Sequence, residues 1–361
     1  MTTRIVFTLF FTLVLIGCGG SGGSSSDNPP VALDPVSLAS YSGPGSKWDF
    51  ELNDDGTFHI ERRAMPGDPV DLTVDGDYVE QDNGFMLLTV TSAEGTDAPS
   101  AGETAWALEV PGFALFLRPT DAAGEFIAMV EAGNCPTENF VGNWVVVKNR
   151  VGADATDPDQ DYLGAFAFDA TAVGATLPGR YALAGNFNDL GPVDLEGGTC
   201  NDGIMLVDDA AMYLTQSGAA IVHTNLSDED EAHIIFAVPQ DTLAAINDLD
   251  DDYVGLVFDP LFNGDSVSPA TAECSAGICN GEIFDSVDSS TPVGTYVLNL
   301  TGTLDFPEPG FITGEITSDG ETGVIGCAVS DNLGSAGNRL IICVGQSPGD
   351  NTANFNLILS N

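Results

Sequence analysis

Apolar and polar residues alternate in the stretch Ser46–Arg63, SKWDFELNDDGTFHIERR. From Trp48 to Leu52 every second residue is apolar, which is the period of a β-strand with one buried face. The sequence NDDG at residues 53–56 is a hairpin turn signal, and the alternation resumes at Phe58. The stretch therefore predicts an antiparallel β-hairpin.

Similar short runs continue along the chain, separated by Gly, Asp, Asn and Pro, and no segment has a sustained helical period. Further strands are expected at Val74–Glu80, Phe85–Thr91, Thr104–Val110, Phe113–Arg118 and Phe126–Glu131, and one short helix at Gln240–Asn247. Many short strands with frequent turns are typical of sandwiches and barrels. We predict an all-β protein, with an antiparallel meander or barrel over residues 36–133, followed by one or two β-sandwich or barrel-like units.

The pair Lys47-Trp48, followed by Asp55-Gly56-Thr57-Phe58, resembles the start of the small lipocalin-like domains of bacterial lipoproteins. Ser46 stands where the lipocalin pattern has glycine. The resemblance implies a barrel at residues 36–133 whose aromatic residues line either a core or a small-molecule cavity.

A second region begins with Gly142-Asn143-Trp144, which fits the Gly-x-Trp pattern. The segment Asp157–Gly164, DPDQDYLG, is echoed by Asp248–Gly255, DLDDDYVG, and each leads into an apolar run. Such a repeat predicts two related β units, 134–210 and 211–361, which are either separate domains or halves of one domain.

The N-terminus reads as an export signal. The apolar run Ile5–Ile16 is too short to span a bilayer as a helix, and it ends in small residues. Residues 1–17 are therefore predicted to be a signal peptide. Leu15-Ile16-Gly17-Cys18 resembles the bacterial lipobox, which implies that Cys18 is lipidated and becomes the mature N-terminus.

The residue after Cys18 is Gly19 rather than the Asp that resembles an inner-membrane retention signal, which implies the outer membrane, with the body facing the periplasm or the cell surface. Several acyl chains on one cysteine would anchor the protein stably in the membrane. The Gly/Ser-rich sequence that follows has nothing apolar to bury. We assign residues 18–35 as lipid anchor and flexible tether.

The composition is strongly acidic, with 54 Asp and Glu residues against 9 Lys and Arg and a formal net charge of −45. A hydrophobic fraction of 43% suffices for packed cores, so the acidity does not indicate disorder. Such a surface repels nucleic acid and attracts cations, basic proteins or cationic surfaces. Adaptation to salty water explains the same composition, because screening removes the self-repulsion.

Six cysteines follow Cys18, an even number that in an exported protein argues for disulfides. They are Cys135, Cys200, Cys274, Cys279, Cys327 and Cys343. Fifteen connectivities are possible, of which pairing between sequence neighbours is the simplest. A metal or redox role for Cys274 and Cys279 lacks a nearby histidine and the CxxC spacing.

Two Asp-x-Asp-x-Asp triplets are the sharpest candidate sites. They consist of Asp157, Asp159 and Asp161 in the first copy and of Asp248, Asp250 and Asp252 in the second. Alternate carboxylates on a loop can converge on a hard cation, so Ca²⁺ is the expected cofactor. The triplets depart from an EF-hand, whose sixth position is Gly where Tyr stands here, and acidic turns are also expected by chance in so acidic a chain.

The sequence favours no particular enzyme. It has no His-Glu-x-x-His pair and no Gly-rich phosphate loop. Of the three histidines, His59 lies in an alternating strand, and His223 and His233 flank an acidic segment that suits a solvated loop better than a transition-metal pair.

A lipid-anchored, non-catalytic envelope or surface lipoprotein that binds a protein or small-molecule ligand is the favoured function. A structural partner of an outer-membrane complex is one alternative, and it requires an exposed apolar patch or an unpaired edge strand. An extracellular hydrolase is the other, and it requires a cleft with converging carboxylates.

Overall fold

The computed structural model describes residues 41–361 apart from several short segments. The residues not described within this range are 43–46, 65–67, 82–83, 121–126, 132–134, 149–162, 183–187, 196–197, 202, 208–209, 216–217, 225–233, 241–242, 244, 259–266, 303–308, 334–337 and 348–349. Residues Leu33–Asn361 belong to a single unit.

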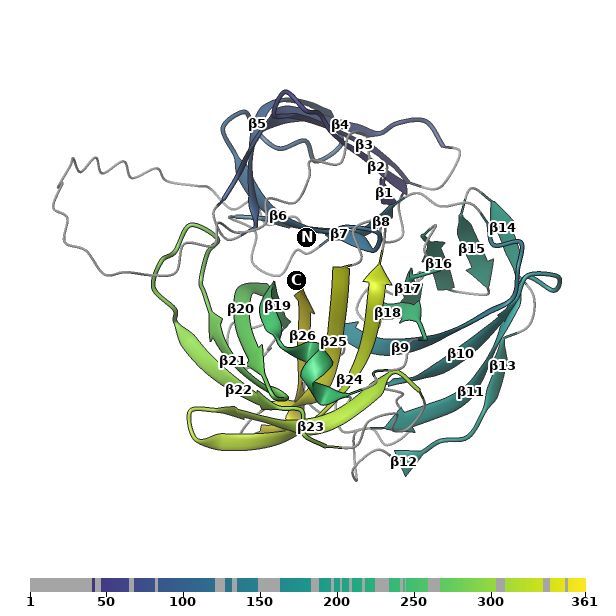
Figure 1. Cartoon of the computed structure of the whole chain (residues 1–361). Helices are drawn as coiled ribbons and strands as arrows, with labels where there is room; N and C mark the ends of the chain where they lie inside the picture. Colours follow the sequence, from purple (N-terminus) through teal and green to yellow (C-terminus); the bar gives the residue numbers. More distant parts are fainter. Residues whose placement is uncertain are drawn as a thin grey trace, which may run out of the picture. The chain divides into compact units, whose positions relative to one another are not determined.

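The N-terminal sheet is an eight-stranded antiparallel meander that curls around one of its faces (Figure 1). Its strands are β1 (Tyr41–Ser42), β2 (Lys47–Leu52), β3 (Thr57–Arg63), β4 (Leu72–Glu80), β5 (Met86–Gly95), β6 (Thr104–Val110), β7 (Ala114–Pro119) and β8 (Ile127–Glu131). Strands β2 to β8 pair with one another in chain order, and β1 pairs with β8. The turn at residues 53–56 sets Leu52 opposite Phe58, as the alternation predicts.

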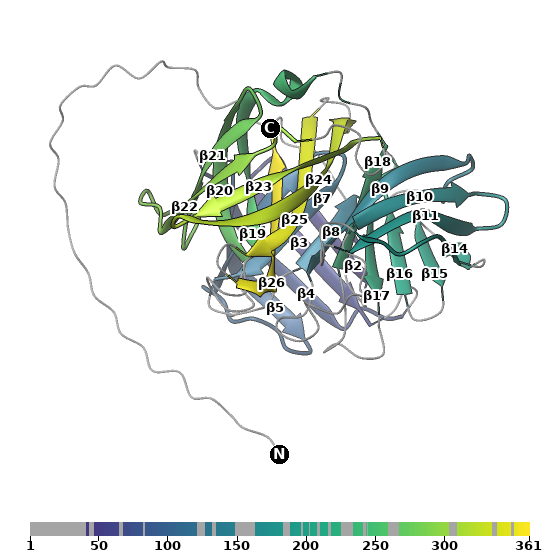
Figure 2. The same ribbon diagram turned by 90° about the horizontal axis from the view of Figure 1, so that it is seen from below.

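The central sheet has ten strands, and its middle is formed by β9 (Phe140–Lys148) and β18 (Ile234–Pro239). The other strands are β10 (Leu163–Asp169), β11 (Gly174–Ala182), β12 (Asn188–Asp189), β13 (Val193–Leu195), β14 (Thr199–Asn201), β15 (Ile204–Val207), β16 (Ala210–Leu214) and β17 (Ala220–Thr224). Strands β10 to β13 extend the sheet beyond β9 (Figure 1), and β17 to β14 extend it beyond β18 (Figure 2).

The C-terminal barrel is closed by eight antiparallel strands. They are β19 (Asp251–Phe258), β20 (Val267–Ser275), β21 (Ile278–Ile283), β22 (Gly294–Asn299), β23 (Phe311–Ser318), β24 (Glu321–Leu333), β25 (Asn338–Ser347) and β26 (Asp350–Ser360). Pairing of β19 with β26 over Val254–Phe258 completes the ring. A 3-10 turn, η3 (Ile246–Leu249), precedes β19 and contributes the buried Leu249 to the barrel core.

Strands in all three sheets are buried on both faces. In β7, Leu115 faces the core of the N-terminal sheet, whereas its neighbour Phe116 belongs to a second cluster, here called the shared core. In β25, Ile341 faces the barrel interior and Ile342 the shared core. The central sheet likewise gives Val145 of β9 to the shared core. Continuous apolar runs thus mark the strands where two sheets meet.

Buried amides reinforce the contact between the central sheet and the barrel. The Asn356 Nδ2 donates to the carbonyl of Val146 at 2.8 Å, and the Asn143 Nδ2 donates to the carbonyl of Pro309 at 2.6 Å. Both asparagines are almost fully buried, so each bond satisfies a donor that would otherwise be costly to bury.

The all-β fold is confirmed, and strands lie at each predicted position in the N-terminal sheet. The boundary expected between residues 210 and 211 falls inside the central sheet, where β15 and β16 are hydrogen-bonded neighbours. The expected helix Gln240–Asn247 includes residues 241–242 and 244, which lie outside the described residues, and at its end the structure forms the 3-10 turn Ile246–Leu249. Among the described residues, no helix combines the length and apolar character needed to cross a membrane.

The cysteines pair as sequence neighbours. The bonds are Cys135–Cys200, Cys274–Cys279 and Cys327–Cys343. The last two join residues directly opposite each other on adjacent strands, and all four of their cysteines lie in the barrel core. Disulfides at these places fit an exported protein.

Gly281 offers a test of the barrel packing. A Cβ at this position would lie 2.0 Å from Cζ of Tyr296, which is buried inside the barrel and donates a hydrogen bond to the carbonyl of Thr271. We expect Gly281→Ala to lower the free energy of unfolding by about 1–3 kcal/mol, because the buried ring of Tyr296 must shift to accept the added methyl group. Urea unfolding followed by fluorescence measures this change. Glu282→Ala, at the exposed next residue, is the control, and equal effects of the two substitutions would contradict the proposed packing.

Candidate functional site

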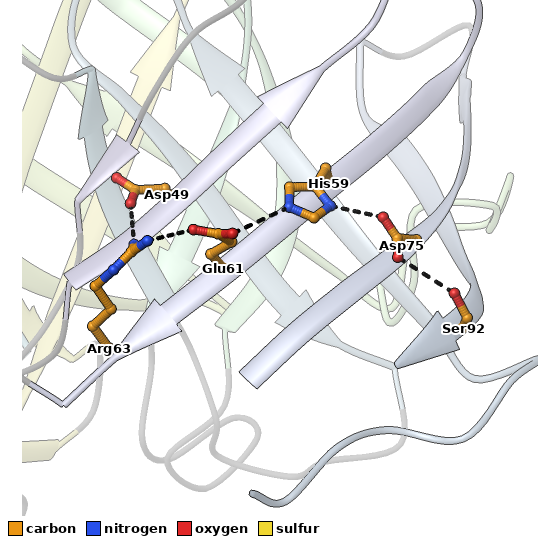
Figure 3. A network of polar contacts seen from close by, with 6 residues as sticks. All are labelled: Asp49, His59, Glu61, Arg63, Asp75 and Ser92. Carbon is orange, nitrogen blue, oxygen red and sulfur yellow. Dashed lines mark hydrogen bonds and ion pairs between the residues drawn. The ribbon is translucent and has the colours of Figure 1, made fainter. Parts of the chain in front are cut away.

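The outer face of β2 to β5 carries a chain of polar side chains, here called the charged network (Figure 3). It consists of Asp49 on β2, His59, Glu61 and Arg63 on β3, Asp75 on β4 and Ser92 on β5. Because side chains alternate along a strand, the apolar Phe58 and Ile60 point inward while these residues point outward. The sheet register places Asp49 opposite Glu61 and Asp75 opposite both His59 and Ser92.

Arg63 connects two opposing acids. Its Nη1 lies 2.5 Å from Asp49 Oδ2, and its Nη2 lies 2.5 Å from Glu61 Oε2. Like charges directly opposite on neighbouring strands are destabilising, so the guanidinium offsets a repulsion that the register imposes. All three side chains remain partly exposed, and such pairs contribute at most about 1 kcal/mol each.

His59 is held among three carboxylates. Its Nδ1 lies 2.7 Å from Asp75 Oδ1, its Nε2 lies 3.8 Å from Glu61 Oε1, and Glu51 stands opposite on β2. The hydrogen bond to Asp75 raises the pKa of His59 most strongly, partial burial opposes it, and the charges of Asp75, Glu61 and Glu51 add to the increase. The network therefore favours the imidazolium form.

The network contains the residue types of a Ser-His-Asp triad in an order that does not activate the serine. The Ser92 Oγ donates to Asp75 Oδ2 at 3.4 Å, and the imidazole of His59 contacts the other oxygen of the same carboxylate. In a catalytic triad the histidine stands between serine and aspartate and removes the serine proton. Here Asp75 stands between them, so the arrangement is an exposed ion-pair network.

One sequence pattern typical of a nucleophile also lacks the structural context that it requires. Gly345–Gly349, GQSPG, fits the Gly-x-Ser-x-Gly pattern, which acts as a nucleophile only on a sharp strand-to-helix turn. In this structure Ser347 ends β25 and is paired with Asp350 of the antiparallel β26.

Two carboxylates of the second Asp triplet accept hydrogen bonds from the backbone. Asp248 accepts a hydrogen bond from the Ala245 N–H at 2.9 Å, and Asp250 accepts one from the Ala276 N–H at 2.5 Å. Asp252 lies exposed at the start of β19. Among the described residues, no three His, Cys, Asp or Glu side chains are grouped to hold a metal ion.

Several predicted site residues lie outside the described part of the chain. They are Cys18, His233 and the first triplet, Asp157, Asp159 and Asp161. Calcium binding by the triplets therefore stays a prediction. His223 is described and is buried on β17, with its ring 6.0 Å from that of Tyr213.

Of the acidic residues around His59, only Glu51 could be predicted from the sequence. The turn at residues 53–56 fixes the pairing of β2 with β3 and so places Glu51 opposite His59. Asp75 lies on β4, and the length of the connection from β3 does not determine the register between these two strands. A bulge between Asp75 and Gly76 also shifts the pairing of β4 with β5.

Among the described residues, buried apolar side chains line the interior faces of the two curled sheets. Phe50, Phe58 and Leu88 occupy that of the N-terminal sheet. In the C-terminal barrel, Tyr253 donates to the carbonyl of Leu249 at 3.0 Å and accepts from Arg339, so its polar end is satisfied within the protein. Burial raises the pKa of Tyr253 above its usual value, while Arg339 lowers it.

Comparison with known proteins gives only distant similarity. No protein-family model matches the chain, and no curated protein matches it. Among solved structures, transferrin binding protein B of Haemophilus parasuis Hp5 (Trp-176-Ala mutant) is 10% identical, with a TM-score of 0.29 and 88% of this chain covered. Isotype 1 transferrin binding protein B of serogroup B Neisseria meningitidis is 8% identical, with a TM-score of 0.27 and 88% covered. The chain spans 66% and 65% of the length of those two chains.

The charged network predicts a pH dependence of stability. Because the pKa of His59 is higher in the folded than in the unfolded protein, the stabilisation is fully present below the unfolded value of 6.5 and is lost as the pH rises through the folded value. His59→Gln should therefore cost most stability below pH 6.5 and little at high pH, as measured by unfolding midpoints at fixed ionic strength.

Histidine NMR provides the control. Asp75→Asn should move the pKa of His59 back towards 6.5, with the resonance assigned by its absence in His59→Gln. A His59 pKa that does not respond to Asp75→Asn would contradict this account of the network.

Proposed function

We propose that this chain is a lipid-anchored, non-catalytic lipoprotein of the bacterial envelope or surface, which binds a macromolecular partner through the outer faces of its sheets. The proposal rests on the contrast between the apolar inner faces of the curled sheets and the charged side chains on the outer face of β2 to β5. The inward faces of β2–β5 and of the C-terminal barrel are packed with apolar side chains, and the charged network lies on the outside. The close packing of these described interior side chains supports surface recognition over small-molecule capture.

The partner is expected to be a protein or a surface of low or positive charge. A net charge of −45 repels polyanions over the whole surface, which disfavours nucleic acid. It also accelerates encounter with a basic partner, and this contribution weakens as salt increases.

The hydrolase alternative receives less support from the described carboxyls. A general acid needs a raised pKa, usually from burial. The pKa of Asp71 is instead lowered, chiefly by its hydrogen bond with Arg62, and that of Asp55 is lowered by hydrogen bonds from Thr57. For the assembly alternative, two exposed large apolar residues among those described, Val79 of β4 and Val141 of β9, lie in different sheets rather than in one patch. The edge strands β12 and β14 at the ends of the central sheet are the feature that this alternative could use.

Anchoring is tested at the lipobox. Cys18→Ala should abolish the incorporation of radiolabelled palmitate and move the protein from the membrane to the soluble fraction, because no acyl chain can then be attached at this position. Ser21→Ala in the tether is the matched control and should leave both readouts unchanged. Membrane retention of the Cys18→Ala protein without label would overturn lipid anchoring through this residue.

Surface binding is tested by photocrosslinking in intact cells. A benzophenone amino acid replaces Asp77 on the outer face of β4, Asn280 on the outer face of β21, or the buried Leu88. We expect a discrete protein adduct at one or both outward positions and none at position 88. Failure to crosslink at both outward positions, or a small-molecule adduct at position 88 alone, would overturn the proposal.

A further inference from the structure

The three disulfides lie in different surroundings. The four cysteines of the C-terminal barrel are buried, with exposed fractions of 4% for Cys274 and 0% for Cys279, Cys327 and Cys343. Cys135 and Cys200 are each partly exposed. Access decides whether an external thiolate can reach a disulfide, so the Cys135–Cys200 bond is the accessible one.

Cys200 lies on a short edge strand of the central sheet. It is the middle residue of β14, which has three residues, ends the sheet and, among the described strands, pairs with β15 alone. Opposite Cys200 stands the buried Met205, and Cys200 packs against the apolar cluster around Met205, Trp144 and Phe166. With three residue pairs to β15, this edge strand is only weakly held in the sheet.

The other cysteine belongs to a different part of the chain. Cys135 lies between β8 of the N-terminal sheet and β9 at the middle of the central sheet, 65 residues before Cys200. The bond therefore fastens the end of the central sheet to the segment that enters it. Its loss would free β14 from that segment and leave every described strand pair of the C-terminal barrel intact.

We propose that the Cys135–Cys200 disulfide is a thiol–disulfide exchange site whose reduction releases β14 from the central sheet. The reductant is a dithiol, such as the active site of an envelope oxidoreductase. One of its thiolates attacks the sulfur of Cys135 or Cys200 and forms a mixed disulfide, while the other protein sulfur leaves as a thiolate. The second thiol of the reductant then displaces the protein sulfur. Two electrons pass from the dithiol, which becomes a disulfide, to the protein, which gains two thiols.

Selective reduction is the first test. The oxidised full-length protein in detergent is treated with dithiothreitol without denaturant, and thiols are trapped with N-ethylmaleimide and mapped by mass spectrometry. Cys135 and Cys200 should be labelled at least tenfold faster than the four barrel cysteines. Equal rates, or earlier labelling of a barrel pair, would overturn the proposal.

Hydrogen exchange on the same protein tests the structural consequence. After selective reduction, the amides of β14 and β15 should exchange at least tenfold faster, while those of β20 to β25 stay unchanged. The double variant Cys135→Ser/Cys200→Ser should reproduce this pattern, and Cys274→Ser/Cys279→Ser is the control that should not. If the variant fails to fold, the reduced native protein alone decides. Unchanged exchange in β14 after reduction would overturn the release of the strand.

Discussion

Burial of single strands on both faces is the constraint on which the arrangement of the three sheets depends. Phe116 and Leu115 are adjacent in β7 but serve different cores, and Ile341 and Ile342 do the same in β25. A sheet with one apolar face can close on itself and stay separate, whereas a strand with two apolar faces requires a second layer. The shared core is that second layer for all three sheets.

This constraint also explains where the charge lies. With the apolar outer faces of β7, β8 and β25 covered, the exposed outer faces belong to strands that alternate, such as β3 and β4. The alternation places Asp49 opposite Glu61, and the Arg63 guanidinium contacts both carboxylates. His59 lies opposite Glu51 on β2 and opposite Asp75 on β4. In this part of the sheet, an excess of acidic residues is thus compatible with strand pairing because a basic side chain contacts the neighbouring carboxylates.

Sequence reasoning succeeded where the signal was local. The alternation around the turn at residues 53–56 gave the first hairpin and its register, and sequence-neighbour pairing gave the disulfides. It failed where the outcome depends on distant partners. The echo between Asp157–Gly164 and Asp248–Gly255 marks two strand starts, β10 and β19, but strand starts do not say which sheet a strand joins. Two further outcomes depend on distant partners: β9 pairs with β18, and Asp75 lies opposite His59.

The closure of the C-terminal barrel by its first and last strands has a kinetic consequence. Val254 pairs with Ser360 and Phe258 with Asn356, contacts that join segments about a hundred residues apart. Hairpins such as β20–β21 can form as soon as their residues are available, but the ring has no final partner for β19 until β26 arrives. Non-local pairings of this kind slow folding. Until they form, β19 and β26 are two open edges to which a foreign strand can add, so the time between synthesis and closure is when this protein is most exposed to aggregation.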